Sequence, residues 1–275
     1  MTYTEYPLEQ GTDEWLQARC GMVTASFIDG LIATRKLTAI DHECPACAAP
    51  ANEPCISARG GEPIKSLHPD RAAVARSQSS PTIIEAASNE TSRDITVRLA
   101  AERITGRIDP VFVTDDMWRG TVEEPLARDK YHHNYAPVRE LGFMVRDIGG
   151  ARIGYSPDGL VDDGNGLIEI KSRRPKKHVK TVVADTAPIE NMAQMQTGLL
   201  VSGRDWCDYI SYSGGMAMWV KRVFPDPRWQ KAIVDAARRA ENGITETVRV
   251  YAAATEGLVM TELTDLTSEL EIKVA

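Results

Sequence analysis

Two acidic residues and a lysine fall close together in the stretch GYSPDGLVDDGNGLIEIK, residues 154–171. Asp158 precedes a turn-rich run, and Glu169 and Lys171 belong to the alternating segment that follows it. Successive side chains of a strand point to opposite faces, so Glu169 and Lys171 should emerge on the same face. The Asn-Gly pair at 165–166 tolerates positive φ and is typical of a hairpin turn. We therefore expect two antiparallel strands that bring Asp158 close to Glu169 and Lys171.

Two carboxylates on paired strands would form an oxygen-rich site for a hard divalent cation. Mg2+ usually binds one or two carboxylates together with waters and substrate phosphate. The neighbouring lysine would then orient or deprotonate an attacking water. The same spacing also fits an Asp-Gly turn followed by a solvent-exposed Glu-x-Lys pair, and spacing alone does not decide between the two.

A second group of reactive side chains lies earlier in the chain. Cys44 and Cys47 have C-x-x-C spacing, and Cys55 and His68 follow them. Three thiolates and an imidazole are the ligands of a closed tetrahedral zinc site. The segment around them has few large apolar residues, so it would need a metal to fold. The alternative is a loop with unconnected thiols.

These patterns predict how the chain is divided. We expect residues 1–36 and 93–275 to form the core, and residues 37–92 to form an inserted zinc-binding module and linker. The insert should have a basic edge that either touches DNA or is purely structural, made of Arg59, Lys65, Arg71 and Arg76. An odd number of cysteines without an export signal argues against a disulfide framework.

The first helices of the core offer a candidate anion site. The stretch QGTDEWLQARCGMVTASFIDGL, residues 10–31, predicts two short helices, with Thr24 or Ser26 capping the second and Arg19 near their junction. Backbone N–H groups, a hydroxyl and an arginine together can bind an anion. The alternative is an ordinary helix pair with a surface arginine.

A later helix is predicted to begin near Thr121, because Pro125 is tolerated best in a first turn. Glu124, Arg128 and His132 would then share one face. That face either forms a salt-bridged surface or adds a third carboxylate to the metal site. The remaining expected elements are helices over 95–104, 189–201 and 228–242, strands over 138–148, 151–155, 206–212 and 216–224, and a weakly ordered tail.

Composition limits the possible partners and location. The 275 residues include 32 Lys and Arg against 39 Asp and Glu, a net charge of −7. Any contact with DNA would need a local basic patch, because the chain as a whole is acidic. No run approaches the roughly 18 apolar residues of a membrane span, and the first residues lack a signal-peptide pattern. We expect a cytoplasmic protein with no membrane partner.

Four separated stretches resemble one family in the order in which they occur: QGTDEWLQARCGMVTAS, RGTVEEPLAR, GYSPDGLVDDGNGLIEIKS and MAQMQTGLLVSGRDWCDYISY. They are similar to the phage-type alkaline exonucleases of the lambda exonuclease and YqaJ recombinase group, within the PD-(D/E)xK nuclease superfamily. The resemblance implies an α/β fold with an αβββαβ core, in which helices flank a mixed central sheet. The insert, with its Cys-Pro-x-Cys, Pro-Cys and His-x-x-Arg order, resembles small zinc fingers of actinobacterial and phage proteins.

The resemblance also implies roles for the acidic residues and the lysine. Asp158 and Glu169 would be metal ligands, and Lys171 would position or activate water. Glu124 matches the acid of the RGxxxE helix and would be a third metal ligand, with Glu123 as the alternative if the register slips by one.

Three further positions match residues near the family's catalytic centre or its DNA end. Gln194 matches the first glutamine of a Q-x-Q helix, although Gln196 lies closer to the apolar stripe of that helix. Arg19 and Ser26 match positions that hold the 5'-phosphate of the DNA.

The implied reaction is phosphodiester hydrolysis with one or two Mg2+ or Mn2+ ions, besides a structural Zn2+. The enzyme would degrade linear double-stranded DNA from 5' ends and leave 3' overhangs for single-strand annealing. A single-strand annealing protein would be its partner, a homotrimer around DNA is compatible with the family, and a bacterial host cell carrying a phage or prophage is the implied setting. The alternatives are an endonuclease of the same superfamily and a zinc-dependent DNA-binding protein with an inactive nuclease core.

Overall fold

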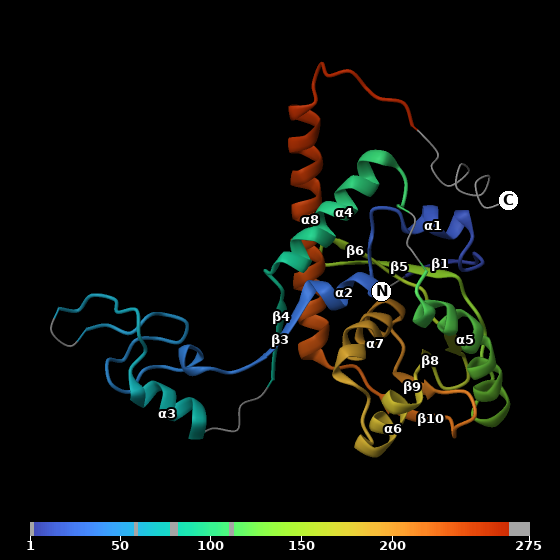
Figure 1. Cartoon of the computed structure of the whole chain (residues 1–275), viewed down its shortest axis with the longest axis horizontal. Helices are drawn as coiled ribbons and strands as arrows, with labels where there is room; N and C mark the ends of the chain where they lie inside the picture. The colour runs from blue at the N-terminus through green and yellow to red at the C-terminus, as the bar shows by residue number, and fades with distance from the viewer. Residues whose placement is uncertain (1–2, 58–59, 78–81, 110–112, 264–275) are drawn as a thin grey trace.

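The computed structural model describes residues 3–57, 60–77, 82–109 and 113–263. Figure 1 shows a main body of sheets and helices and a smaller lobe that stands apart from it on a two-stranded ribbon. The long final helix runs along the side of the body that faces the ribbon. The fold is therefore a mixed α/β body with a small appended lobe.

The described strands form three sheets, two of which are mixed. One sheet has the order β1-β5-β6-β2, the second has the order β10-β9-β8-β7, and β3 pairs only with β4. The strand bounds are β1 Thr4–Tyr6, β2 Val23–Thr24, β3 Ile32–Lys36, β4 Thr82–Ala86, β5 Phe143–Ile148, β6 Ala151–Tyr155, β7 Gly159–Val161, β8 Gly166–Ser172, β9 Trp206–Tyr212 and β10 Trp219–Val223. The expected single central sheet is thus divided in two, because the chain leaves β6 at Tyr155 and begins β7, in the other sheet, at Gly159.

The predicted hairpin is confirmed. Strands β7 and β8 are antiparallel, with Leu160 opposite Leu167, and Asn165 adopts a positive φ of 55° in the turn. The side chains of β8 alternate as expected. Leu167 belongs to the larger core cluster, whereas Ile168 and Ile170 belong to the cluster beneath helix α5.

The described helices cover the sheets. Their bounds are α1 Asp13–Arg19, α2 Ala25–Leu31, α3 Pro69–Ser77, α4 Glu90–Thr105, α5 Asp115–Asn134, α6 Pro175–Ala184, α7 Ile189–Ser202 and α8 Pro227–Ala254. The larger core cluster draws on α2, α4, α7 and α8 and includes Ile28, Leu99, Ile153, Leu199 and Ile233. Burial of this apolar surface is the main force that holds the body together.

Helix α5 begins earlier than the sequence predicted. Thr114 caps its first turn by accepting a hydrogen bond from the backbone N–H of Met117, and Pro125 lies inside the helix. The acidic residues Asp115 and Asp116 favour this start because they interact with the positive end of the helix dipole. Pro125 removes only the donor that would bond the Thr121 carbonyl. The prediction of a start near Thr121 was therefore wrong.

Two other helices differ from expectation. Helix α6 had no counterpart in the predicted elements, although Pro175 at its first position is a common start signal. Helix α8 continues to Ala254, well past the predicted end near residue 242. Gly243 does not end the helix, because it is a close-packing position: a Cβ there would lie 2.8 Å from Cγ2 of Thr96 on α4. Most of the expected tail, residues 264–275, lies outside the described residues.

Candidate active site and Cys/His lobe

Strand β8 presents the central acid and base of the candidate active site. The Glu169 side chain is fully buried, and it forms an ion pair with the Lys171 ammonium group two residues further along the strand. Lys171 also donates a hydrogen bond of 3.0 Å from Nζ to Oε1 of Gln194 on α7. The strand and α7 together hold the lysine next to the buried carboxylate.

Asp158 joins this group from the turn between β6 and β7. Its Oδ2 accepts a hydrogen bond of 2.6 Å from the backbone N–H of Ile170, the residue between Glu169 and Lys171. The turn itself is held by Gln10, whose Nε2 lies 3.0 Å from the carbonyl oxygen of Pro157. The hairpin thus brings Asp158 against β8, as the sequence predicted.

Helix α5 contributes Glu124 to the same group, and the alternative residue Glu123 points elsewhere. Glu123 Oε2 accepts a hydrogen bond of 2.5 Å from the Ser172 hydroxyl. Glu124 interacts electrostatically with both Asp158 and Lys171, and its Oε1 lies 2.5 Å from Nη2 of Arg128. We use the name acid centre for Glu124, Asp158, Glu169 and Lys171.

Burial and mutual repulsion raise the pKa values of the carboxyl groups in the acid centre. Burial, followed by the charge of Asp158, raises the pKa of Glu124 to about 7. Burial is also the main reason that the pKa of Glu169 rises to about 8. The pKa of Lys171 rises even though burial opposes its charge, because Glu169 and Asp158 stabilise the ammonium. Carboxyls that resist ionisation when crowded together are typical of sites that a cation completes.

The donor set of the acid centre suits a hard divalent cation. Apart from the ion pair with Lys171, neither buried oxygen of Glu169 has a hydrogen-bond partner among the described residues. A buried carboxylate without donors is costly, and a bound cation would satisfy it. Glu124, Asp158 and Glu169 would therefore hold a Mg2+ or Mn2+ ion with oxygen ligands only.

The two glutamines of α7 have different environments. Gln194 contacts Lys171, as described above, and so lies beside the acid centre. Gln196 is fully buried; its Nε2 donates to the Phe224 carbonyl at 2.8 Å and its Oε1 accepts from the Asp226 N–H at 2.8 Å. Gln196 therefore fixes the connection between β10 and α8, and Gln194 is the glutamine that contacts the acid centre.

Arg19 and Ser26 are brought together at the start of α2. Nη2 of Arg19 lies 3.1 Å from the Ser26 hydroxyl, and the guanidinium stacks 3.9 Å from the centre of the Trp15 ring. Burial lowers the pKa of Arg19 to about 10. Trp15 is fixed in turn, because its indole N–H lies 3.1 Å from the Gly142 carbonyl and 3.0 Å from the Ser156 hydroxyl.

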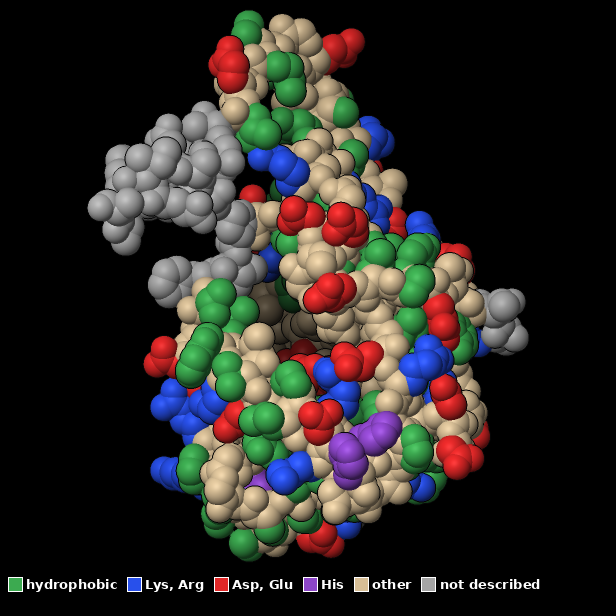
Figure 2. All heavy atoms as spheres, turned by 90° about the vertical axis from the view of Figure 1, so that its right-hand side faces the viewer, with side chains coloured by type: hydrophobic (Ala, Val, Ile, Leu, Met, Phe, Trp, Pro, Cys, Tyr) green, Lys and Arg blue, Asp and Glu red, His purple; other side chains and the backbone are tan. Residues whose placement is uncertain are grey.

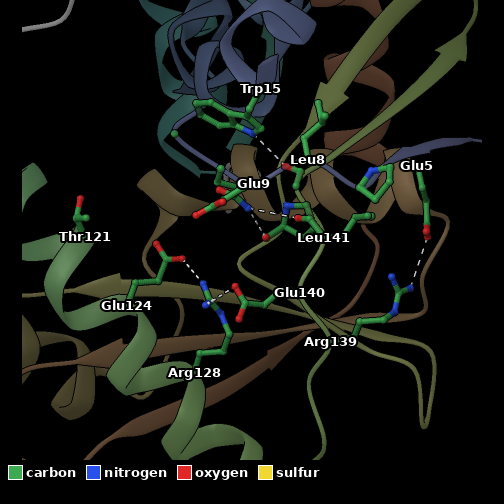
Figure 3. Close-up of a pocket in the computed structure, with 15 residues that line it drawn as sticks. Glu5, Leu8, Glu9, Trp15, Thr121, Glu124, Arg128, Arg139, Glu140 and Leu141 are labelled. Carbon is green, nitrogen blue, oxygen red and sulfur yellow. Dashed lines mark hydrogen bonds and ion pairs between the residues drawn. The ribbon is translucent and has the colours of Figure 1, made fainter. Parts of the chain in front are cut away.

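A cavity of about 720 Å³ extends from this aromatic residue to the acid centre. Its wall includes Trp15, Pro157, Glu124 and Arg128, and Figure 3 shows Glu124 and Arg128 pointing toward each other at its edge. Figure 2, which views the side of the molecule that lies to the right in Figure 1, shows a hollow with acidic side chains at its bottom. A substrate in this cavity could therefore reach Glu124.

The four predicted ligands of the lobe are also close together. The sulfur atoms of Cys44, Cys47 and Cys55 and a ring nitrogen of His68 all lie within 4.8 Å of one another. Backbone N–H groups, first that of Ile56, lower the pKa of Cys47 to about 6 despite opposing burial. Ligand atoms of a tetrahedral zinc site are separated by roughly 3.8 Å when Zn–S bonds are about 2.3 Å. The number, type and spacing of these four ligand atoms therefore fit a zinc ion.

Arg71 is the centre of the lobe and not part of a basic edge. Its side chain is 0 % exposed, and its guanidinium donates to four backbone carbonyls, those of His42, Glu53, Ile40 and Pro50, at 2.7, 2.7, 3.1 and 2.6 Å. Lys65 and Arg76 remain on the lobe surface, and Arg59 lies outside the described residues. The prediction of a basic edge was therefore wrong for Arg71.

Arg128 makes contacts beyond Glu124 that the sequence did not predict. The i,i+4 spacing placed it beside Glu124, and that pairing is confirmed. The spacing gave no sign of its further contacts, because these involve residues from distant segments of the chain.

Similar proteins support this description. Residues 69–205 match the YqaJ-like viral recombinase domain, and residues 10–88 match a phage zinc finger domain to which DNA binding has been ascribed. The alkaline exonuclease LHK-Exo from Laribacter hongkongensis is 24% identical, with 90% of this chain and 100% of that chain covered and a TM-score of 0.62. The same values hold for its complex with dAMP. No curated protein matches this sequence.

The fold and the Cys/His cluster define the class of protein: a mixed α/β fold similar to that of an alkaline exonuclease, with a small Cys3His lobe. Within that fold, residues 69–205 carry a YqaJ-like viral recombinase domain, and domain and fold together support a nuclease. In the described part of the chain, no helix is both long and apolar enough to cross a membrane.

Proposed function

We propose that the protein is a Mg2+- or Mn2+-dependent exonuclease that hydrolyses linear double-stranded DNA. The observation that carries this proposal is the acid centre itself. Three carboxylates from α5, the β6–β7 turn and β8 meet beside Lys171. Apart from the ion pair with Lys171, the buried oxygens of Glu169 have no hydrogen-bond partner among the described residues. A module that only bound DNA would gain nothing from burying this set, because the uncompensated carboxylates are costly.

The ions would supply a water of lowered pKa and positive charge for the departing 3'-oxygen. In this mechanism, Glu124, Asp158 and Glu169 would hold the ions through their carboxylates. The Lys171 ammonium would stabilise the negative charge that develops on the scissile phosphate. Gln194 accepts a hydrogen bond from that ammonium through its side-chain oxygen and would help to orient it.

Arg19 and Ser26 would hold the 5'-phosphate of the DNA end, which favours degradation from 5' ends and leaves 3' overhangs. Their proximity supports this role, because a guanidinium and a hydroxyl 3.1 Å apart can bind one phosphate together. The guanidinium is also kept in place by stacking on Trp15, a residue that lines the cavity.

The wider setting follows from the same proposal. The core of residues 1–36 and 93–275 would contain the catalytic residues, and residues 37–92 would form an accessory module whose fold is stabilised by zinc. A 3' overhang is the substrate of a single-strand annealing protein, which we propose as the functional partner in the cytoplasm of a bacterial host. A homotrimer that encloses the duplex would let such an enzyme stay on one DNA molecule.

The proposal is tested with a linear duplex labelled separately at its 5' and 3' ends, beside a closed circular control, in Mg2+ and in EDTA. We expect Mg2+-dependent release of the 5' label and an intact circle. Cutting of the circle would instead assign the acid centre to an endonuclease. A complete absence of cutting in Mg2+ and Mn2+ would leave a DNA-binding protein with an inactive core.

The phosphate role has its own test. Arg19→Ala should remove the preference for 5'-phosphorylated over 5'-hydroxyl ends. An unchanged preference would refute the assignment of Arg19 and Ser26 while leaving the acid centre in place.

A further inference from the structure

Arg128 connects the two metal-binding acids that lie outside β8. Its Nη2 bonds Oε1 of Glu124 at 2.5 Å on the same helix. Its Nε donates to the backbone carbonyl of Asp158 at 2.7 Å, in the turn between β6 and β7. One guanidinium therefore spans the gap between α5 and the turn that carries Asp158.

The remaining nitrogen of this guanidinium, Nη1, faces an exposed residue. Nη1 of Arg128 lies 2.8 Å from Oε2 of Glu140, whose side chain is 74% exposed, whereas the arginine side chain is only 14% exposed. Figure 3 shows Arg128 between Glu124 and Glu140 at the edge of the cavity. The arginine thus has a second carboxylate partner in addition to Glu124, and this partner comes from another segment of the chain.

This arrangement suits a planar group with fixed donor directions. The guanidinium offers several N–H donors in a rigid fork, so three partners from three segments fix its position. Fixing the arginine also fixes the distance between the Glu124 carboxylate and the Asp158 backbone. An ammonium group has no such fork and could not hold all three partners in the same geometry.

We propose that Arg128 is a positioning residue of the metal centre, which sets the separation of Glu124 and Asp158 and so determines how tightly the centre binds its divalent ion. This inference rests on the proposed function, because it requires the acid centre to bind Mg2+ or Mn2+. Arg128 contacts the ligands and not the reacting phosphate. Groups that orient metal ligands in this way commonly change metal affinity by about 10-fold to 100-fold when they are lost.

Arg139 provides a matched control. It is another arginine on the wall of the same cavity, but its ion pairs are with Asp162 and Glu5, both outside the acid centre. Replacing it removes the same charge from the same cavity and leaves the contacts of Arg128 unchanged.

The test is isothermal titration of Mn2+ into full-length, DNA-free protein, with wild type, Arg128→Met, Arg128→Lys and Arg139→Met compared. The lobe is first loaded with one zinc per chain and unbound zinc is then removed, so that neither the lobe nor free zinc contributes. We expect Mn2+ binding at least tenfold weaker in Arg128→Met and also weakened in Arg128→Lys, which keeps the charge but not the fork. Arg139→Met should stay within twofold of wild type. In a parallel Mn2+ titration of DNA hydrolysis, Arg128→Met should need more metal for half-maximal rate and recover most of kcat at saturation.

Each other outcome is informative. Wild-type affinity in Arg128→Met would overturn the inference. Full recovery in Arg128→Lys would overturn it as well, because the fork of the guanidinium would then not be needed. So would an equal loss in Arg139→Met, because the effect would then not be specific to the contacts of Arg128. If Arg128→Met does not give a cooperative melt, Arg128→Lys decides by the same criterion. Failure of the wild-type protein to bind Mn2+ and to cut DNA would refute the proposed function instead.

Discussion

Arg71→Met is expected to release zinc from the lobe while leaving the main body folded. The change removes a guanidinium from a side chain that is 0 % exposed. Its four hydrogen bonds to the carbonyls of His42, Glu53, Ile40 and Pro50 are lost, together with a longer one of 3.5 Å to Sγ of Cys55. At about 1 kcal/mol for each buried bond, the loss is on the order of 4 kcal/mol. Three thiolates and a neutral imidazole also leave one negative charge on a divalent ion, which the guanidinium offsets.

Zinc binding and lobe folding are expected to be one equilibrium, because the lobe has only a small apolar cluster. A loss of about 4 kcal/mol then corresponds to a zinc affinity about three orders of magnitude weaker. The assay is competition with a chromophoric chelator, with thermal unfolding of the body followed in the same samples. Arg76→Met is the control, because Arg76 lies on the same helix but is exposed.

The result that would refute this reasoning is a zinc affinity in Arg71→Met within tenfold of wild type. The carbonyls would then have found other donors, and the arginine would not be holding the lobe together. A loss of zinc in Arg76→Met as large as in Arg71→Met would refute it equally, because helix α3 as a whole would then be responsible.

Three further predictions concern the acid centre and its surroundings. Lys171→Ala and Asp158→Asn should each lower Mg2+-dependent hydrolysis by at least about 100-fold, because each removes charge at the reacting phosphate or its metal. Full activity in either variant would show that the acid centre is wrongly assigned. The pKa values of Glu124 and Glu169 are raised to about 7 and 8, and both groups must be deprotonated when a metal binds, so Mn2+ affinity should rise as pH increases from 6.5 to 8.5. Calorimetry in two buffers of different ionisation enthalpy will detect any protons released. A pH-independent affinity would contradict the raised pKa values. Gln194→Ala should slow hydrolysis with little change in Tm. Gln196→Ala should instead destabilise the fold by about 1–3 kcal/mol, because it leaves the Phe224 and Asp226 backbone groups unpaired. Thermal melts and rate assays of both variants test this, and the reverse pattern would show that the two roles are exchanged.

The features that sequence predicted correctly are those determined by local pattern. The hairpin follows from a turn whose residues favour positive φ and from strict alternation in β8, and both are properties of neighbouring residues. The C-x-x-C spacing with its following Cys and His likewise identifies the four lobe ligands directly. The assignment of Glu124 over Glu123 required the family motif as well, because both residues lie on the same turn of α5.

The features that sequence did not predict depend on contacts between distant segments. The burial of Arg71 requires four carbonyls from separate turns of the lobe to converge, which no spacing rule describes. Helix α5 starts earlier than expected because a capping threonine and two first-turn aspartates matter more than Pro125. Helix α8 extends past its expected end near residue 242, and Gly243 within it allows α4 and α8 to approach closely.

The ribbon of β3 and β4 has a consequence for how the lobe is joined to the body. Its pairing runs from Ile32 opposite Ala86 to Lys36 opposite Thr82, so the chain leaves the body and returns to it at adjacent positions. A short turn between Lys36 and Thr82 could therefore replace the lobe and leave this pairing in place. Insertion or removal of a segment at this point would then change the lobe without moving the strands on which the body depends.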